Sequence, residues 1–200
     1  MILAHPGVDV NLKNKSGWTA FMVTCNGGKT SCARLLLKDS RVKVNKPNND
    51  GETPLWFAVF NGGLDIIKWW IASGREMDLG TPEELYKDDE IWVAMTKGMA
   101  LLERFKENPE ETRYTTRVEL GYLDELAAEV FALVVFVSDG LLRIRDQNTS
   151  VPTVRFFAIA TQLPLELQMV LCHRLLGLGK EIIPGKDSEA AFKSLAKRLW

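Results

Sequence analysis

The sequence has few of the residues on which metal sites and disulfide frameworks depend. Its 200 residues include two histidines and three cysteines, namely His5, His173, Cys25, Cys32 and Cys172. An odd number of thiols is typical of reduced cysteines in a cytoplasmic protein rather than of a disulfide framework. Cys25 and Cys32 occupy small or apolar positions and are expected in the core. No spacing of these residues matches a metal site, so we predict no metal and no cofactor.

The sequence also lacks a strong charge of either sign and a long apolar run. With 25 basic and 26 acidic residues, the net charge is −1. This balance argues against nucleic acid or an anionic membrane as an obligatory partner, because both select a basic surface. The nearly continuous apolar stretch 126–137 is too short for a bilayer, which needs about 20 residues. Without a signal peptide at the start, we predict a cytoplasmic location and do not exclude the nucleus.

What the sequence does contain is one pattern written twice at a constant shift of 34 residues. The shared positions are a turn glycine, a threonine and a second glycine: Gly17, Thr19 and Gly28 in the first copy, and Gly51, Thr53 and Gly62 in the second. In each copy the threonine can cap a helix, and the second glycine can end it. One such helix–turn–helix unit is too small to bury its own apolar face, so the copies are expected to stack.

The second copy, with Thr53-Pro54-Leu55 followed by Ala58, resembles the T-P-L-H-x-A pattern of ankyrin repeats. Each copy departs from that pattern. In the first copy Ala20 replaces the proline and Met22 the histidine, and in the second copy Trp56 replaces the histidine. The resemblance implies stacked helix pairs with protruding β-turns.

We therefore predict an all-α protein in which an ankyrin-repeat solenoid precedes a helical carboxy-terminal domain. Residues 1–105 would hold a partial repeat (1–7), two whole repeats (8–41 and 42–76) and an eroded one (77–105). In the eroded repeat we expect a short helix starting at Thr81, a longer helix, and no proper turn, with Gly98 echoing Gly62. The partial repeat belongs either to a longer array or to an open face that a second copy could cover by self-association.

The charged segment 106–117 is predicted to be a linker, because it holds Pro109 and few apolar residues. Residues 118–200 would form the carboxy-terminal domain. Stretch 126–137 is predicted to be a buried helix, with strands at 131–137 and 141–145 as the alternative. Three further helices are expected at 154–161, 165–176 and 188–199.

Nothing in the sequence supports catalysis. The run Gly28-Lys29-Thr30-Ser31 resembles part of a phosphate-binding loop, but Val23 stands where a glycine is needed, and a helix is expected where a strand should precede it. Cys172 and His173 are adjacent and would point to different sides of a helix. Glu129 either is an acid with a perturbed pKa, or it points outward or pairs with a nearby arginine. We predict no catalytic residues; the alternative, an enzyme with a site at the domain junction, would require a polar pocket near His173 or Glu129.

The pattern instead favours non-catalytic binding of another protein through the turn tips and the concave helix face. The residues predicted to contact the partner are Lys15, Ser16, Trp18, Asn26, Asn49, Asp50, Glu52, Phe60 and Asn61. Large aromatic side chains at an interface bury much area at little entropic cost. Trp18 and Phe60 are therefore either binding hot spots or contacts between neighbouring repeats.

A second motif, Leu163-Pro164-Leu165-Glu166-Leu167, resembles the opening of an F-box. It is similar also to the F-box-like segment that follows ankyrin repeats in poxvirus-type proteins. The resemblance implies docking to a Skp-type adaptor of a cullin ubiquitin ligase, carried by Leu163, Pro164, Leu167 and Leu171. The alternative is a helical cap that closes the repeat stack.

Overall fold

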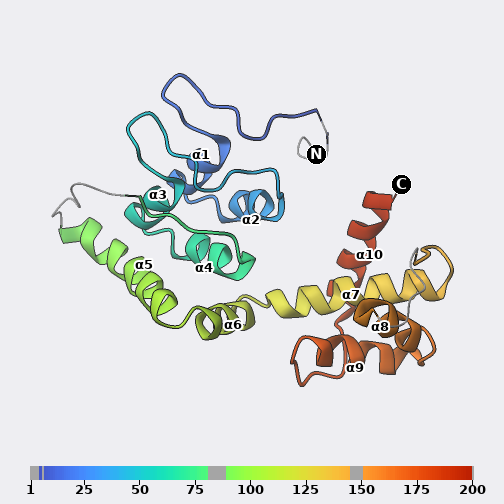
Figure 1. Cartoon of the computed structure of the whole chain (residues 1–200). Helices are drawn as coiled ribbons and strands as arrows, with labels where there is room; N and C mark the ends of the chain where they lie inside the picture. Colours follow the sequence, from blue (N-terminus) through green and yellow to red (C-terminus); the bar gives the residue numbers. More distant parts are fainter. Residues whose placement is uncertain (1–4, 6, 81–88, 145–150, 200) are drawn as a thin grey trace. The chain divides into compact units, whose positions relative to one another are not determined.

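The computed structural model describes residue 5 and residues 7–80, 89–144 and 151–199, with the backbone alone for 89–94 (Figure 1). Within these ranges the regular elements are all helices: α1 (Ala20–Asn26), α2 (Thr30–Lys38), α3 (Pro54–Phe60), α4 (Leu64–Ser73), α5 (Asp89–Glu107), α6 (Pro109–Glu119), α7 (Tyr122–Ser138), α8 (Pro152–Ala160), α9 (Leu165–Leu175) and α10 (Gly185–Leu199). The predicted all-α fold is confirmed. The chain divides into two compact units, residues 1–120 and 121–200.

The first unit is a stack of helix pairs. Thr19 caps α1 by accepting a hydrogen bond from the Met22 amide at 3.3 Å, and Thr53 caps α3 through the Trp56 amide at 3.2 Å. Helix α1 packs on α3 and helix α2 on α4, so equivalent helices of successive repeats lie side by side (Figure 1). The 34-residue sequence repeat is therefore also a repeat in space.

A fully buried tryptophan joins the two repeats in the core. Trp70 lies edge-on to Phe21 with ring centroids 5.0 Å apart, and both side chains are buried. The indole N–H donates to the Glu76 carbonyl oxygen at 3.0 Å, so its polar atom is satisfied. Its neighbour Trp69 is half-buried and lies under the Arg34 guanidinium, 4.2 Å from the ring centroid. The two tryptophans thus serve core and inter-repeat packing, as expected from Leu35 and Leu36, which stand 34 residues earlier.

A third layer follows, and it corrects the prediction for 106–117. Helix α5 packs on α3, and helix α6, which fills most of the predicted linker, packs on α4 and α5. The segment is helical because Asn108 caps it: its Oδ1 accepts from the Glu111 amide at 3.3 Å while its Nδ2 donates to the Glu111 carboxylate at 2.7 Å. Arg117 donates to the Ala72 carbonyl oxygen at 2.8 Å, tying α6 to α4.

Gly98 also differs from its expected role. It lies inside α5 rather than between two helices, and a Cβ placed there would stand 2.9 Å from Cδ1 of Ile67. The glycine therefore permits close packing of α5 against the second repeat. The helix start expected at Thr81 falls outside the described residues. So do most of residues 1–7, on which the partial repeat and its open face were predicted.

The second unit is built around α7, which contacts α8, α9 and α10. Stretch 126–137 is confirmed as part of one helix, whose residues Ala127, Ala128, Phe131, Ala132 and Val134 are buried. Phe192 of α10 packs edge-on against Phe131 and Phe136, with centroids 6.1 and 5.8 Å apart. The three later helices are present within a few residues of their predicted bounds.

Candidate protein-binding surface

Two protruding turns, residues 14–18 and 48–52, are built by identical hydrogen bonds. Asn14 Oδ1 accepts from the amides of Ser16 and Trp18 at 3.0 and 2.9 Å. One repeat later, Asn48 Oδ1 accepts from the amides of Asp50 and Glu52 at 3.0 and 2.9 Å. Because an asparagine side chain closes each turn from within, the tip residues have a defined conformation.

The two turns are also joined to each other. The Asn49 side-chain Nδ2 donates to the Lys15 carbonyl oxygen at 3.0 Å. The Asn49 backbone N–H donates to the Ser16 carbonyl oxygen at 3.2 Å. At the far ends of α1 and α3, Asn61 Nδ2 donates to Asn26 Oδ1 at 3.1 Å. Exposed polar side chains of neighbouring repeats are thus held in register.

An aromatic cluster lies between these polar positions. Trp18 packs on Phe57 of the next repeat with centroids 4.5 Å apart. Phe60 stacks on Trp56 at 4.8 Å with nearly parallel rings. Trp18, Trp56 and Phe60 are all half-buried, so each rests on a neighbouring ring and keeps one part in solvent. Sequence reasoning missed the contribution of Trp56 and Phe57, although Trp56 was visible as a departure from the usual histidine.

All nine residues predicted for partner contact lie in this unit. Six are exposed: Lys15, Ser16, Asn26, Asn49, Asp50 and Asn61. Glu52, Trp18 and Phe60 are half-buried. The Glu52 carboxylate accepts from Asn48 Nδ2 at 2.7 Å, which fixes it at the edge of the turn. The structure gives these residues a common scaffold; their binding role stays a prediction.

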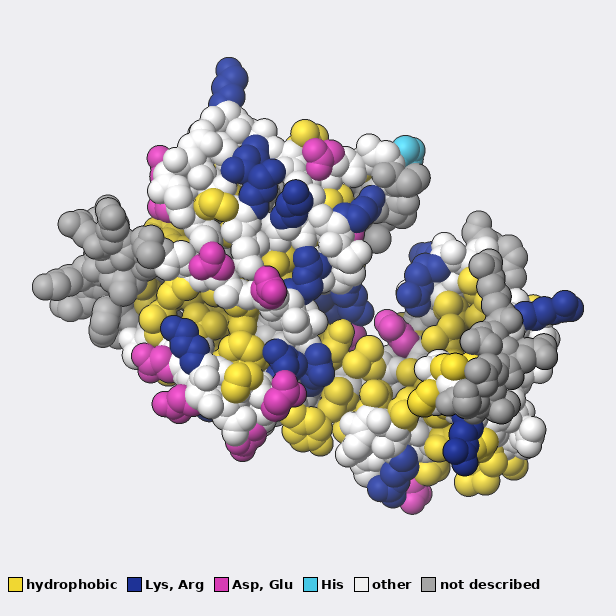
Figure 2. Space-filling model, viewed as in Figure 1, with side chains coloured by type: hydrophobic (Ala, Val, Ile, Leu, Met, Phe, Trp, Pro, Cys, Tyr) yellow, Lys and Arg dark blue, Asp and Glu magenta, His cyan; other side chains and the backbone are white. Residues whose placement is uncertain are grey.

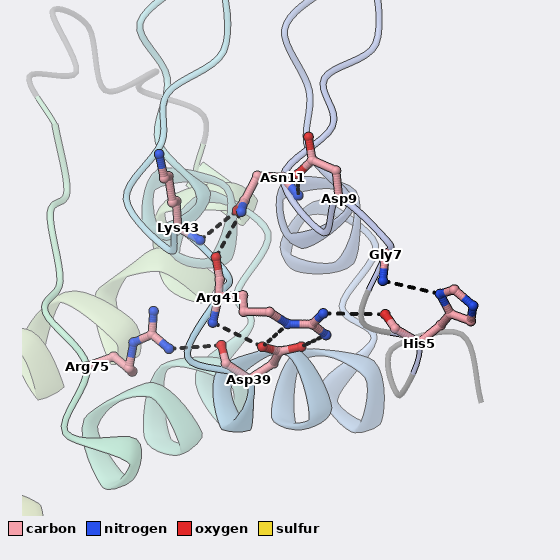
Figure 3. A network of polar contacts seen from close by, with 8 residues as sticks. All are labelled: His5, Gly7, Asp9, Asn11, Asp39, Arg41, Lys43 and Arg75. Atoms are coloured by element: carbon pink, nitrogen blue, oxygen red, sulfur yellow. Dashed lines mark hydrogen bonds and ion pairs between the residues drawn. The ribbon is translucent and has the colours of Figure 1, made fainter.

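At the base of the turns, two arginines 34 positions apart tie each repeat to the one before it (Figure 3). Arg41 pairs with the Asp39 carboxylate at 2.7 Å and reaches the His5 carbonyl oxygen at 3.5 Å. Arg75 donates to the carbonyl oxygens of Asp39, at 3.1 Å, and of Val42. Hydrogen bonding to Arg41 holds the pKa of Asp39 below its ordinary value. The repeat spacing of the two arginines was the signal that could have revealed this network.

Asn11 completes the network by bridging consecutive repeats. Its Nδ2 donates to the Arg41 carbonyl oxygen at 2.8 Å, and its Oδ1 accepts from the Lys43 amide at 2.7 Å (Figure 3). Asn45, one period later, accepts from the Asp78 amide at 3.2 Å. The surface is therefore supported by polar contacts that recur with the repeat.

The residues that the sequence offered for nucleotide binding, metal binding or thiol chemistry do not form a site within the described residues. Gly28 and Lys29 form the short turn between α1 and α2, so a strand does not precede them. In the part of the chain that the structure describes, no group of three or more His, Cys, Asp or Glu could hold a metal ion. Burial raises the pKa of Cys25 and Cys172, that of Cys172 to about 11, which keeps both thiols protonated. Cys32 is exposed, so its predicted core position is wrong: it lies on the outer side of α2.

His173 is fully buried beside Cys172 in the second unit. Neither of its ring nitrogens has a hydrogen-bond partner among the described residues. Burial lowers the pKa of His173; the charge of Lys180 adds to this effect, and the charge of Asp124 opposes it. Glu129, which is half-buried, lies on a different helix, α7, whereas His173 lies on α9.

The second motif coincides with the start of α9. The helix begins at Leu165, directly after Pro164, as proposed from the sequence. Leu165 and Leu167 are 52% and 50% exposed, whereas Leu163 and Leu171 are half-buried. Gln168 donates to the Leu163 carbonyl oxygen at 2.9 Å and so closes the turn before the helix. The apolar start of α9 is thus partly open to solvent.

The comparisons with known proteins agree with this geometry. A family model described as "Ankyrin repeats (3 copies)" matches residues 1–80. The chain is 30% identical over 131 residues to the bovine "SMC5-SMC6 complex localization factor protein 1", covering 60% of this chain and 12% of the relative. The human protein of that name is 35% identical over 74 residues, which are 37% of this chain and 7% of the relative.

A third relative is the "Ankyrin repeat and KH domain-containing protein mask-1" of Caenorhabditis elegans. It is 29% identical over 94 residues, covering 45% of this chain and 4% of the relative. The chain thus spans about an eighth or less of the length of these relatives. No solved structure matches the chain.

Residues 1–80 are therefore ankyrin repeats, and the first unit contains a protein–protein interaction module. Across the described residues, no helix combines the length and apolarity needed to cross a membrane.

Proposed function

We propose that this chain recognises another protein through the turn tips and the α1–α3 face of its ankyrin unit, and that it does so without catalysis. The observation that carries the proposal is the combination of exposure and order at the predicted contact residues. Asn49 and Asn26 are exposed, yet hydrogen bonds of 3.0 and 3.1 Å to or from the neighbouring repeat fix them. A preordered surface loses little conformational entropy on binding, so few contacts suffice.

The aromatic cluster adds apolar area to this surface. Trp18 and Phe60 each pack one part on a neighbouring ring and expose the remainder. Rigid aromatic side chains in such positions are typical hot spots of protein interfaces. The names of two relatives, which describe a localization factor, also support an adaptor role rather than an enzymatic one.

The experiment compares proteins that co-purify with the full chain and with two double variants. Lys15→Ala/Asp50→Ala removes two exposed tip side chains, while Glu181→Ala/Lys186→Ala removes the same two charges from the second unit. We expect a discrete partner with the parent chain and the control, and at least a tenfold loss with the tip variant. Equal recovery by both variants would refute the role of the tips.

The adaptor-docking hypothesis is a second candidate, and the exposure of Leu165 and Leu167 favours it over a purely internal cap. A Skp-type adaptor would bind the start of α9 around Leu163, Pro164, Leu167 and Leu171. We expect the immobilised chain to retain a purified adaptor. The Leu167→Glu variant should lose this retention, and the control variant Leu35→Glu should keep it. An adaptor that is not retained by the folded parent chain removes this candidate.

A further inference from the structure

The positive charges of the chain are unevenly distributed. Residues 10–46 contain eight Lys and Arg but a single acidic residue, Asp39, although the whole chain has a net charge of −1. On the face that Figure 2 draws, several Lys and Arg side chains of the ankyrin unit lie close together, with Asp and Glu side chains among them. Such a local field attracts acidic groups even when the protein as a whole is nearly neutral.

An open groove of about 740 Å³ lies in this region, at the base of the turns. Its lining comes from the loops that follow α2 and α4, residues 40, 42–46 and 74–76. Three cations, Lys43, Lys46 and Arg75, line it against one carboxylate, Glu76. The groove is therefore made by two successive repeats and lies outside the predicted set of tip and α1–α3 contacts.

The three cations do not have the same role. Arg75 is engaged with the carbonyl oxygens of Asp39 and Val42 and so holds the groove together. Lys43 and Lys46 form no ion pair, and their ammonium groups no hydrogen bond, with any residue that the structure describes. Two ammonium groups on a fixed backbone are therefore available for a ligand.

We propose that this groove binds an Asp- and Glu-rich segment of a partner protein. Ser40 and Asn45 add polar groups beside the two lysines, and the buried Val42 and Val44 contribute an apolar floor. Nucleic acid fits less well, because the lining has no aromatic ring on which bases could stack and the chain as a whole, with a net charge of −1, lacks the basic balance of nucleic-acid-binding domains. This proposal rests on the proposed function, namely that the ankyrin unit binds a protein. It uses residues of the groove, however, and not those of the turn tips.

The test is a titration of the full chain with a fluorescent peptide of eight residues that alternates Glu and Ala. Affinity is measured by anisotropy, and the amide signals of the groove loops are followed by NMR. Lys43→Glu/Lys46→Glu reverses the two groove charges. Lys29→Glu/Lys186→Glu reverses two exposed charges elsewhere and is the matched control. The tip variant Lys15→Ala/Asp50→Ala and a single-stranded DNA oligonucleotide of the same charge complete the set.

We expect saturable binding that shifts the signals of residues 40–46 and 74–76, weakens with added salt, and falls at least tenfold in the groove variant alone. Retention in the tip variant would show that the groove works independently of the tips, so that either proposal can fail without the other. Three results would each overturn the proposal: no binding, equal weakening in the groove variant and the control, or tighter binding of the DNA oligonucleotide than of the peptide.

Discussion

At the scale of single residues, the contact between the two turns depends on a glycine with no side chain. Gly17 has a φ of +79°, and a Cβ there would lie 2.4 Å from Oδ1 and 2.6 Å from the amide nitrogen of Asn49. Gly51 occupies the same position one repeat later with a φ of +82°, but a Cβ there would meet no atom of the described residues within 4 Å. The two glycines thus share a backbone conformation and differ in their neighbours.

This difference predicts unequal effects of the same substitution. Gly51→Ala should lower the free energy of unfolding by about 1 kcal/mol, because alanine is strained at positive φ. Gly17→Ala should cost about 1–2 kcal/mol more, since the added methyl group also displaces Asn49. Urea unfolding of both variants measures the difference directly. Equal losses would show that the turns do not pack on each other as described.

A second residue-scale prediction concerns His173 and pH. Burial lowers its pKa in the folded protein, so the unfolded chain binds the proton more readily. Stability from this residue is therefore complete above about pH 6.5, the ordinary pKa of histidine, and is lost as the pH falls below it. The charged groups that act on the ring are Lys180 and Asp124, which form an ion pair at 2.7 Å.

We expect the melting temperature, followed by far-ultraviolet circular dichroism, to fall between pH 7.5 and 5.5. His173→Phe should remove most of this fall, while His5→Gln at an exposed site should leave it unchanged. A variant lacking His173 that loses as much stability as the parent would contradict the assignment.

At the scale of elements, the arginine network predicts which loop side chains stabilise the stack. Arg75 is half-buried and bonded to two carbonyl oxygens, so Arg75→Met should lower the free energy of unfolding by about 1–2 kcal/mol. Lys46→Met in the preceding loop removes an ammonium group that has no partner among the described residues, and it should change the free energy of unfolding by less than about 0.5 kcal/mol. Chemical denaturation of the two variants decides, and a similar loss in both would speak against the network.

The elements also show what the sequence could predict. Helices α1 to α4 followed from Thr19, Thr53 and the 34-residue repeat, because caps and periodicity are local signals. Helix α6 did not, since a short polar helix gains its place from contacts that only the fold supplies: Arg117 to Ala72, and Lys68 to Glu119 at 3.0 Å. The capping sequence Asn108-Pro109-Glu110-Glu111 was the signal present in the linker.

The candidate surface was predictable to a similar degree. Turn position and exposure follow from the repeat, so Asn49 and Asp50 were identified. Their partners across the repeat, such as the Lys15 carbonyl oxygen, depend on how the two turns approach each other. Phe57 of the next repeat half-buries Trp18, and this contact depends on how the two repeats stack. The arginine network at the base of the turns depends on the same stacking.

At the scale of the whole molecule, the chain combines an ankyrin unit, extended by α5 and α6, with a separate helical unit around α7. Ankyrin repeats recognise proteins through the surface that their stacking creates, while the fold alone does not specify the partner. The central claim is therefore that the ordered tip and α1–α3 surface, rather than the second unit, makes the contact that defines this protein.

Site-specific photo-crosslinking tests that claim most directly. A benzophenone side chain replaces Asn26, at the exposed end of α1, or Glu181 in the second unit, and the full chain is irradiated in extracts of the cells that produce it. We predict a discrete protein adduct from position 26 that disappears in the Lys15→Ala/Asp50→Ala background. Adducts from position 181 alone, with the ankyrin unit folded, would contradict the account.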